Sequence, residues 1–399
     1  MTLRNRPESP ERLTIALLEP YDTGSHAAWV RGYAAHSAHH IIPLTLKGQF
    51  WKWRMHGGAV TLARMMREQA PRVDLILATD MLDLSTFLAL TRDLTADTPA
   101  ALYMHENQLT YPVQPGQKRD LHYGFINYAS MLCADGIFFN SAFHMDSWFD
   151  ELPRLLKHFP DYNELHTVDE LRGRSEVLPL GLDLDRLDAW RPIPEPPGRP
   201  PLILWNHRWE YDKNPAEFFQ ALYTLAGRGI DFRLAVLGES FVRVPPEFEE
   251  ARERLGDRIV QFGYLDHPQD YVHWLWRADL IVSTAFHDFF GAAVVEAVYC
   301  RTFPILPRRL AYPQFIPEAL HPHCLYDDHD SLVSLLEAAL KKAAEGVTNP
   351  EVRRESDHHL DMLRRRVAVY AWSQMASEYD RRLEAIHRDA SCRHTQRSR

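Results

Sequence analysis

The sequence predicts an α/β protein with two doubly wound domains, each built around a mostly parallel sheet. Short apolar runs alternate with segments of helical periodicity, and most of the runs are followed by a loop that contains Gly or polar residues. The pattern begins at Leu13–Leu18 and starts again, after a proline-rich segment, at Leu202–Trp205. Ligands bind at the carboxyl ends of the strands in such sheets, so the loops after the apolar runs are the candidate functional segments.

The composition excludes several classes of protein. Of the 399 residues, 45% are hydrophobic and 25% are charged, as in ordinary globular proteins. The four cysteines are widely spaced without a CxxC pair, which disfavours a zinc site or a disulfide framework and favours reduced thiols. No apolar run approaches the roughly 18 residues that cross a bilayer, so we expect a cytoplasmic protein without membrane insertion. A net charge of −9 argues against a wholly basic protein but permits a local basic patch.

Proline content predicts the domain boundary. Residues 191–201, RPIPEPPGRPP, hold six prolines in eleven positions, which favours an extended linker and excludes a helix or a sheet interior. We therefore predict an amino-terminal domain over residues 12–190 and a carboxyl-terminal domain over residues 202–365. The basic segment 389–399 is predicted to be a disordered tail.

The first strand of the amino-terminal domain is followed by the loop Glu19–His26. We predict a helix that begins near Ser25, with Ser25 as its N-cap and Gly24 allowing a tight turn. A ligand contact by His26 is left open, because a first loop of this kind is less specific than a GxGxxG motif.

The most unusual segment of this half is residues 47–58, KGQFWKWRMHGG. We predict a glycine-bounded loop in which Trp51 and Trp53 offer stacking faces beside the charges of Lys52 and Arg54. The alternative is that both tryptophans pack against the domain while the cations are solvated. We favour acceptor binding, because aromatics beside cations suit a polyanion or a base better than a core.

Two further strands of this half end in polar residues. The strand at 100–104 continues into His-Glu-Asn-Gln at 105–108, and the strand at 136–139 is followed by Asn140. Four hydrogen-bonding groups at the end of a buried strand favour a functional site over a polar surface loop.

The carboxyl-terminal half carries a candidate diphosphate site. Arg208 and Lys213 flank a helix that we expect to begin at Pro215, and two cations beside a helix amino end can clamp a diphosphate. The alternative is that both cations are solvated. A strand at 232–237 is followed by a turn at Gly238 and Glu239, and another short strand is predicted at 259–265.

The same half contains HDFFGAAVVE, residues 287–296, between an apolar run at 280–283 and a helix expected from Ala292. Gly291 would bring backbone N–H groups and the helix amino end to one point, where a diphosphate could bind. Asp288 and Glu296 lie eight residues apart and could face one crevice. The alternative, an ordinary turn with a solvated Asp and a helix Glu, is at least as plausible on this segment alone.

These features together resemble the retaining GT-B glycosyltransferases of family four. Arg208 and Lys213 match the donor-phosphate residues of that family, and His105 matches its active-site histidine. Asp288 and Glu296 match its acidic pair, although a Glu is usual at the first position. The resemblance implies two Rossmann-like domains that face across a cleft, with a last helix, about 366–388, that returns to the first domain.

Other motifs are similar to a narrower group, the glycosyltransferase-like domain-containing proteins, which include the tRNA-queuosine α-mannosyltransferases. These motifs are LLEPYDTGSH, WKWRMHGG, MHENQLTYP, FNSAFH and NHRWEYDKNP, and the similarity covers about residues 13–310. It implies retaining transfer of mannose from GDP-mannose to the cyclopentenediol of queuosine in a tRNA anticodon, expected to be that of tRNA-Asp. Queuosine-containing tRNA and a nucleotide sugar would be the partners, with no metal or other cofactor.

The resemblance also implies roles for individual residues. His105 and Asp288 would be catalytic. The donor would contact Gly24, Ser25, Arg208, Lys213, Gly238, Glu239, Tyr264, Leu265, Phe290, Gly291 and Glu296. The acceptor would contact His26, Trp51, Lys52, Trp53, Arg54, Asn107, Gln108 and Asn140. Two other functions stay open, a GT-B transferase that acts on a lipid or a small glycoside and a non-catalytic RNA-binding relative.

Overall fold

The computed structural model describes residues 12–69, 72–113, 116, 118–193, 198–239 and 244–397, with side chains to residue 393. The chain forms two compact units, and we describe each by itself. The first unit runs up to Leu182 and resumes at Trp372, and the second comprises Asp183–Ala371. The units therefore change eight residues before the predicted end of the first domain at 190. The central prolines of the predicted linker, within residues 194–197, lie outside the described residues.

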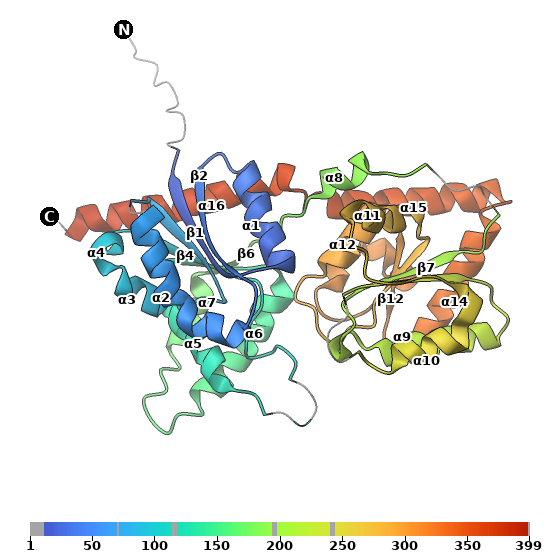
Figure 1. The fold of residues 1–399 in the computed structure, drawn as a ribbon, viewed down its shortest axis with the longest axis horizontal. Helices are drawn as coiled ribbons and strands as arrows, with labels where there is room; N and C mark the ends of the chain where they lie inside the picture. The colour runs from blue at the N-terminus through green and yellow to red at the C-terminus, as the bar shows by residue number, and fades with distance from the viewer. Residues whose placement is uncertain are drawn as a thin grey trace, which may run out of the picture. The chain divides into compact units, whose positions relative to one another are not determined.

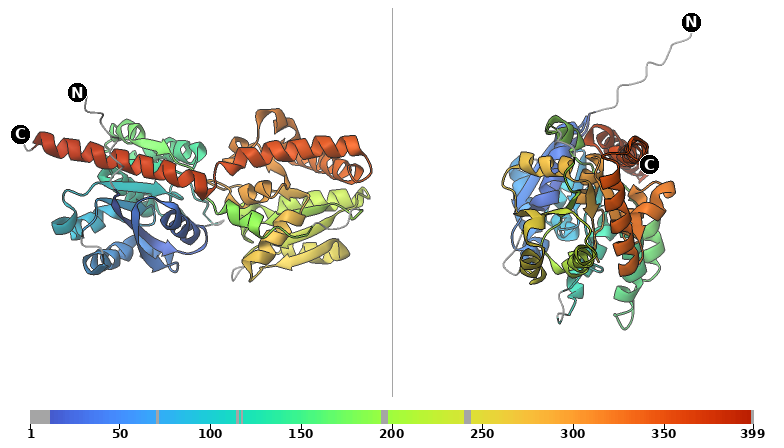
Figure 2. Two further views of the ribbon diagram at one scale, coloured as in Figure 1. Left: turned by 90° about the horizontal axis from the view of Figure 1, so that it is seen from above. Right: turned by 90° about the vertical axis from the view of Figure 1, so that its right-hand side faces the viewer.

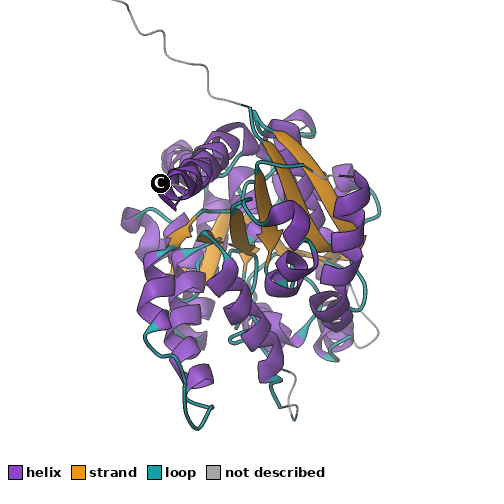
Figure 3. Cartoon of the chain, turned by 90° about the vertical axis from the view of Figure 1, so that its left-hand side faces the viewer, coloured by secondary structure: helices purple, strands orange, loops and turns teal. Residues whose placement is uncertain are grey.

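The first unit is a six-stranded parallel sheet with helices on its faces (Figure 1, Figure 3). Its elements in chain order are β1 (Thr14–Asp22), α1 (Gly24–His36), β2 (His40–Lys47), α2 (Trp51–Gln69), β3 (Leu75–Thr79), α3 (Leu84–Leu90), α4 (Arg92–Thr95), β4 (Ala100–Met104), α5 (Leu121–Cys133), β5 (Gly136–Phe139), α6 (Ala142–Leu156), α7 (Thr167–Gly173), β6 (Ser175–Val177) and α16 (Trp372–Arg397). The strand order is β2-β1-β3-β4-β5-β6. Every residue of β3, β4 and β5 is buried, as expected where helices cover both faces of a parallel sheet.

The last helix, α16, completes the first unit by packing against α1 (Figure 2). The indole Nε1 of Trp29 donates to the hydroxyl of Tyr379 at 3.0 Å, and the hydroxyl of Tyr33 donates to Asp380 at 2.8 Å. Tyr103, on the central strand β4, stacks on Trp29 with ring centroids 4.7 Å apart. Residues from the end of the chain are thus part of the aromatic core beside the first strands.

The second unit is another six-stranded parallel sheet with covering helices. Its elements are α8 (Leu184–Ala189), β7 (Leu202–Asn206), α9 (Pro215–Gly227), β8 (Arg233–Leu237), α10 (Glu247–Leu255), β9 (Ile259–Gly263), α11 (Pro268–Arg277), β10 (Leu280–Val282), α12 (Ala292–Tyr299), β11 (Phe303–Pro307), α13 (His321–Cys324), β12 (Leu325–Tyr326), α14 (His329–Glu345) and α15 (Pro350–Ala368). The strand order is β12-β11-β10-β7-β8-β9. Helix α9 begins at Pro215 as predicted, because proline suits the first helical position.

The strand orders locate one switch point in each sheet, where the direction of winding reverses. It lies between β1 and β3 in the first unit and between β7 and β10 in the second. In doubly wound sheets, ligands bind beside the carboxyl ends of the strands at such a point. The loops after β1, β3, β7 and β10 are therefore the segments that the fold favours for binding.

Three predictions about local structure are wrong. Residues 51–58 are not a loop but the first two turns of α2. Helix α1 begins at Gly24 with Thr23 as its N-cap, so Ser25 is not the cap. Helix α16 continues to Arg397, across the segment for which a disordered tail was predicted.

None of the described helices is both long enough and apolar enough to cross a membrane.

Candidate functional site

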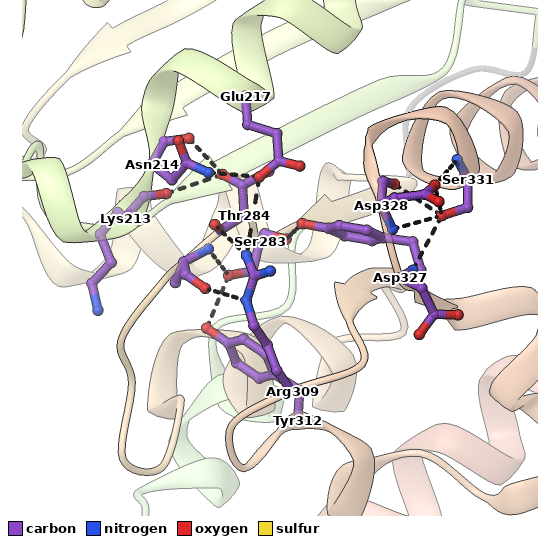
Figure 4. Close-up of polar contacts among 12 residues, drawn as sticks. Lys213, Asn214, Glu217, Ser283, Thr284, Arg309, Tyr312, Asp327, Asp328 and Ser331 are labelled. Carbon is purple, nitrogen blue, oxygen red and sulfur yellow. Dashed lines mark hydrogen bonds and ion pairs between the residues drawn. The ribbon is translucent and has the colours of Figure 1, made fainter. Parts of the chain in front are cut away.

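Hydrogen bonds tie the loops after β7 and β10 to each other (Figure 4). The hydroxyl of Thr284 donates to the backbone oxygens of Lys213 and Asn214, at 3.0 and 2.8 Å. The guanidinium of Arg309 donates to the backbone oxygens of Thr284 and Ala285, both at 3.1 Å. The loop that carries Lys213 is therefore fixed against the loop that leads to Asp288.

Lys213 and Asp288 form the charged centre of this region. The Lys213 ammonium donates to the backbone oxygen of His287 at 2.8 Å and lies 3.7 Å from a carboxylate oxygen of Asp288. The hydroxyl of Tyr312 donates to the same carboxylate oxygen at 3.2 Å. Burial alone would raise the pKa of Asp288, but Lys213, together with His207 and His287, lowers it. Asp288 is thus held as a carboxylate next to a buried ammonium.

Arg208, the second predicted cation, lies in the same loop but is exposed. Its guanidinium is 3.1 Å from the carboxylate of Glu210. The preceding residue, His207, is buried, and burial together with the Lys213 charge lowers its pKa to about 4. At neutral pH the positive charge of this loop therefore belongs to Arg208 and Lys213.

Glu296 projects from α12, the helix that follows the Asp288 loop. Its carboxylate accepts a hydrogen bond from the hydroxyl of Tyr271 at 2.8 Å, and burial raises its pKa more than this bond lowers it. Asn206, the last residue of β7, donates to the Tyr271 hydroxyl and to the backbone oxygen of Ala293. The acid is thereby held beside the switch point of the second sheet.

Two glycines allow close backbone approaches in this region. A Cβ atom on Gly238 would lie 2.0 Å from the backbone oxygen of His207, so no larger residue fits where β8 passes the β7 loop. Gly291 has φ of +94° and precedes the first residue of α12. The first N–H groups of a helix have no partner within the helix, so this end can bind an anion.

The remaining predicted donor residues differ in accessibility. Glu239 and Tyr264 are exposed and Leu265 is half-buried, each just after β8 or β9. Phe290 is buried against Phe315 and Tyr370, so its side chain is not available to a ligand in this arrangement.

A cavity of about 460 Å³ in the second unit lies away from these residues. It is bordered by the first residues of β10 and β11 and by side chains of α14 and α15. Because the candidate donor residues follow the carboxyl ends of the strands, the cavity is at the opposite edge of the sheet.

The first unit gathers a different group at its switch point. Glu19 is fully buried near the end of β1, and its carboxylate lies 2.9 Å from Nδ1 of His26. The ring of His26 lies 4.3 Å, centroid to centroid, from that of His105, which follows β4. Asp80, just after β3, accepts a hydrogen bond from the backbone N–H of His105 at 2.7 Å. Four polar residues from separate segments thus meet beside β1 and β3.

Asn140 holds His105 from the other side. Its amide donates to the backbone oxygen of His105 at 2.8 Å, and its side-chain oxygen is 2.9 Å from Nδ1 of His144. Asn140 is 2% exposed, and its amide is directed at the backbone of His105.

Asn107 and Gln108 also make local contacts. The side-chain oxygen of Asn107 accepts from the backbone N–H groups of Leu109 and Thr110, which is turn chemistry that the sequence argument did not foresee. Gln108 is 8% exposed, and its amide donates to the carboxylate of Glu106 at 2.8 Å. Both side chains therefore make hydrogen bonds within the segment that follows His105.

Trp51 and Trp53 have different environments at the start of α2. Trp51 is half-buried and packs on Tyr123, with Lys52 within 6 Å of both rings. Trp53 is 64% exposed. Its indole lies along Gly57, since a Cβ atom on that glycine would be 2.8 Å from the ring. One tryptophan therefore anchors the helix while the other presents a flat face to solvent.

The other predicted residues of this half lie beside these two groups. Nε of Arg54 donates to the backbone oxygen of Lys47 at 3.1 Å. Gly24, with φ of +52°, and Ser25 are exposed at the start of α1, two residues and one residue before His26.

Among the described residues, one group has the composition of a metal site, namely Glu19, His26 and His105. Its potential ligand atoms lie within 4.8 Å of one another. The Glu19 carboxylate and Nδ1 of His26 are already hydrogen-bonded to each other, so we interpret the group as an ion pair beside a second imidazole.

Sequence reasoning missed Glu19, Asp80 and Tyr271. A signal for Glu19 was present, because a carboxylate directly after an apolar strand at a sheet's carboxyl end is unusual in a core. Tyr271 is one of several aromatics in α11, and no pattern in the sequence distinguishes it.

Comparison with known proteins identifies the family. Residues 14–182 match the family described as tRNA-queuosine alpha-mannosyltransferase N-terminal, and residues 188–345 match glycosyl transferases group 1. The tRNA-queuosine alpha-mannosyltransferase of Drosophila melanogaster is 35% identical over 315 residues, which cover 76% of this chain and 82% of that protein. The chain belongs to the tRNA-queuosine alpha-mannosyltransferase family. It is a glycosyltransferase, as the sequence predicted.

More distant similarities agree with this family. A GDP-mannose-dependent alpha-(1-6)-phosphatidylinositol dimannoside mannosyltransferase of Mycobacterium tuberculosis is 25% identical over 225 residues, 55% of each chain. Among solved structures, a glycosyltransferase from Rickettsia africae superposes with a TM-score of 0.66 at 14% identity, covering 95% of this chain and 99% of that one. Sucrose-phosphate synthase from Thermosynechococcus elongatus gives 0.66 at 15% identity, covering 93% and 98%. These structures confirm the predicted fold class, a GT-B fold of two α/β domains.

Proposed function

We propose that this protein transfers mannose from GDP-mannose to the cyclopentenediol of queuosine in the anticodon of tRNA-Asp, with retention at the anomeric carbon. The observation that carries the proposal is the match of residues 14–182 to the amino-terminal model of the family, together with a 35% identical relative named tRNA-queuosine alpha-mannosyltransferase. The second domain matches glycosyl transferases group 1. The dependence of the mycobacterial relative on GDP-mannose supports the choice of donor.

The second unit carries charged groups that could stabilise a nucleoside diphosphate as it leaves. Lys213, Arg208 and the amino end of α12 would supply positive charge to the diphosphate. Positive charge placed in advance lowers the barrier, because it stabilises the charge that develops on the leaving group. Glu296 would accept hydrogen bonds from the ribose hydroxyls, and Asp288 would hold hydroxyls of the sugar.

The same arrangement supports a reaction without a divalent metal. The two cations and the helix end would perform the neutralisation that a metal performs in other transferases. We expect excess EDTA to leave the transfer rate within about 20% of its value in buffer, an order-of-magnitude allowance for ionic strength. A loss of activity that Mg²⁺ or Mn²⁺ restores would contradict metal independence but not the proposed reaction.

The acceptor would bind to the first unit. The exposed face of Trp53 would stack on a base that the anticodon loop splays out, with Lys52 near the backbone phosphates. His105 would contact the sugar near the reacting centre. Trp51, packed on Tyr123, would hold the start of α2 in place.

The decisive experiment uses tRNA from cells that contain queuosine and from cells that lack it. Each tRNA is incubated with the protein and GDP-mannose, digested to nucleosides and analysed by mass spectrometry. We expect a gain of one hexose only on queuosine, and only in tRNA-Asp among the fractionated tRNAs. UDP-glucose and GDP-glucose, as alternative donors, should give less than a tenth of the product, an order of magnitude set by lost hydrogen bonds in the donor site.

The possible outcomes separate the alternatives. Absence of product on both tRNA pools, with transfer to a lipid or a small glycoside, would replace the acceptor but keep the enzyme class. Binding of tRNA without turnover of any sugar nucleotide would favour a non-catalytic RNA-binding protein. Equal product on both pools would exclude queuosine as the acceptor.

A further inference from the structure

We propose that Glu19 is a positioning residue that acts through His26, so that His105 is held neutral and in a fixed orientation at the site. This proposal depends on the proposed function only for the reaction in which His105 takes part. Neither Glu19 nor Asp80 was among the predicted site residues.

The contacts form a continuous series from β1 to β4. The two oxygens of the Glu19 carboxylate accept from the backbone N–H of Tyr21 at 2.7 Å and contact Nδ1 of His26 at 2.9 Å. The His26 ring faces that of His105 at 4.3 Å and is tilted by 41°. Trp29 also contacts His105, edge to face, with centroids 4.7 Å apart. Glu19 therefore contacts His26 directly, and the His26 ring contacts that of His105.

Charge decides which imidazole carries the proton. Two imidazolium rings at this distance would repel each other strongly in a buried site, so one is expected to be charged and the other neutral. His26 has the carboxylate bonded to it. Burial by itself would lower the pKa of His26, but Glu19, with Asp80 and Glu106, raises it to about 9.

The pKa of His105 is shifted in the opposite direction. Burial, the charge on His26 and the nearby His144 lower its pKa well below the usual value. Its backbone is held from both sides, by Asp80 at the N–H and by Asn140 at the carbonyl. Its Nε2 is buried and has no hydrogen-bond partner within the described part of the chain.

A buried ion pair is weak evidence of a role in stability alone. Glu19 lies in a strand whose other buried residues are apolar, and replacing a buried ion pair by apolar residues of similar volume is often neutral or stabilising. A buried carboxylate and imidazolium beside the proposed reacting centre are the arrangement that sets the protonation state of a neighbouring catalytic group.

The groups that face the two rings define the pH range. Glu19, Asp80 and Glu106 face His26, while His26 and His144 face His105. Because folding raises the pKa of His26, the contribution of the ion pair to stability is fully present below about pH 6.5, the usual value for His, and is lost as the pH rises through about 9. His105 would stay neutral throughout this range.

The test uses the full-length chain with Glu19→Gln, which keeps the shape and removes the charge. Nitrogen-15 NMR of histidine-labelled protein, with His26→Gln to assign the signal, would follow the protonation of His26. We expect its midpoint, near pH 9 in the wild type, to fall by at least one pH unit in Glu19→Gln. Glu19→Asp keeps the carboxylate and should recover part of this shift.

Kinetics supply the second measurement. In Glu19→Gln, His26 loses its charge at lower pH and no longer keeps His105 neutral, so the acidic limb of the kcat profile should move to higher pH. The KM for GDP-mannose should stay within about twofold, because Lys213, Arg208 and Glu296 lie in the other unit. A lower kcat with an unchanged profile would mean a purely structural role and would overturn the proposal. A His26 midpoint that does not respond to Glu19→Gln would also overturn it, whether or not the protein transfers mannose.

Elemental analysis of the purified wild type completes the test. One equivalent of tightly bound metal that disappears in Glu19→Gln would replace the ion pair by a metal site and contradict the proposal. Because the NMR and metal measurements need no substrate, failure of the proposed function would leave them interpretable.

Discussion

Replacing Lys213 by Met tests the proposed donor site most directly. The change removes the ammonium and keeps an unbranched side chain of similar length. In the wild type the ammonium donates to the backbone oxygen of His287 and lies 3.7 Å from Asp288. The ammonium also lies 3.3 Å from the buried carboxylate of Asp212. The variant therefore leaves two carboxylates and a backbone oxygen without their cation, and it removes one of the two charges proposed for the diphosphate.

Two magnitudes follow from this geometry. A charge-assisted hydrogen bond to a phosphate contributes about 1.5–3 kcal/mol, so we expect kcat/KM for GDP-mannose to fall about 10- to 150-fold. The stability of the protein should fall as well, by about 2–3 kcal/mol, below the range for a fully buried pair because the Asp288 side chain is 20% exposed.

The pH dependence has a definite sign. Lys213 lowers the pKa of Asp288, so the pair stabilises the protein above the usual pKa of Asp and loses its contribution as the pH falls through the lowered value. In Lys213→Met, burial dominates and the pKa of Asp288 should rise. The difference in stability between the two proteins should then be largest near neutral pH and should shrink under acidic conditions.

The assay is steady-state transfer at varied GDP-mannose, with urea unfolding at pH 7 and pH 4 on the same preparations. Lys341→Met is a matched control, since Lys341 is 63% exposed in the same unit and pairs only with Glu337 among the described contacts. The control should stay within about 0.5 kcal/mol and twofold in kcat/KM. A Lys213→Met enzyme whose kcat/KM is within threefold of the wild type would refute the assignment of Lys213 to the diphosphate.

The remaining predictions concern three other positions. Trp53→Ala should raise the KM for tRNA about 5- to 150-fold, because roughly 1–3 kcal/mol of base stacking is lost, and it should leave GDP-mannose binding in calorimetry unchanged. Tyr162 is an exposed aromatic residue of the same unit, and the control Tyr162→Ala should change neither quantity. Glu296→Ala should abolish GDP-mannose binding in calorimetry while tRNA binding in a filter assay persists. Gly238→Ala should lower the unfolding free energy by about 3–5 kcal/mol in urea titrations, because the added Cβ meets the backbone oxygen of His207; a stable variant would show that the loop can move.

Most of the fold was predictable because parallel strands are buried on both faces. The apolar runs at 73–79, 100–104 and 202–205 contain the strands β3, β4 and β7, whose residues are all buried, and their pattern is local. The extension of β1 to Asp22 was not predictable, because it depends on pairing between Asp22 and Lys47 of β2. Glu19 was therefore assigned to a loop.

The error at residues 51–58 has a tertiary cause. Two adjacent glycines disfavour a helix, and the sequence alone gives them no other purpose. In the structure Gly57 lies under the indole of Trp53. Gly58 lies against Pro20 of β1, and a Cβ atom on Gly58 would be 3.0 Å from the Cβ atom of Pro20. Contacts with a distant strand and a stacked ring decide the conformation of this segment.

The candidate site was predictable as a list of segments rather than as a set of contacts. Lys213 and Asp288 lie in different loops that meet because β7 and β10 are neighbours in the sheet. The division between Trp51 and Trp53 depends on Tyr123, about 70 residues away in the chain. Turn chemistry at Asn107 was overlooked because its side chain was considered only as a ligand-binding group.

The position of α16 at the end of the chain determines the order in which the two units can fold during synthesis. The core around Trp29 and Tyr33 receives Tyr379 and Asp380 only after the whole second unit has left the ribosome. The second unit is continuous in sequence and can fold during synthesis, whereas the first must wait with an incomplete aromatic core. A premature stop before Trp372 would therefore damage the earliest-made part of the chain while removing none of the proposed donor or acceptor residues.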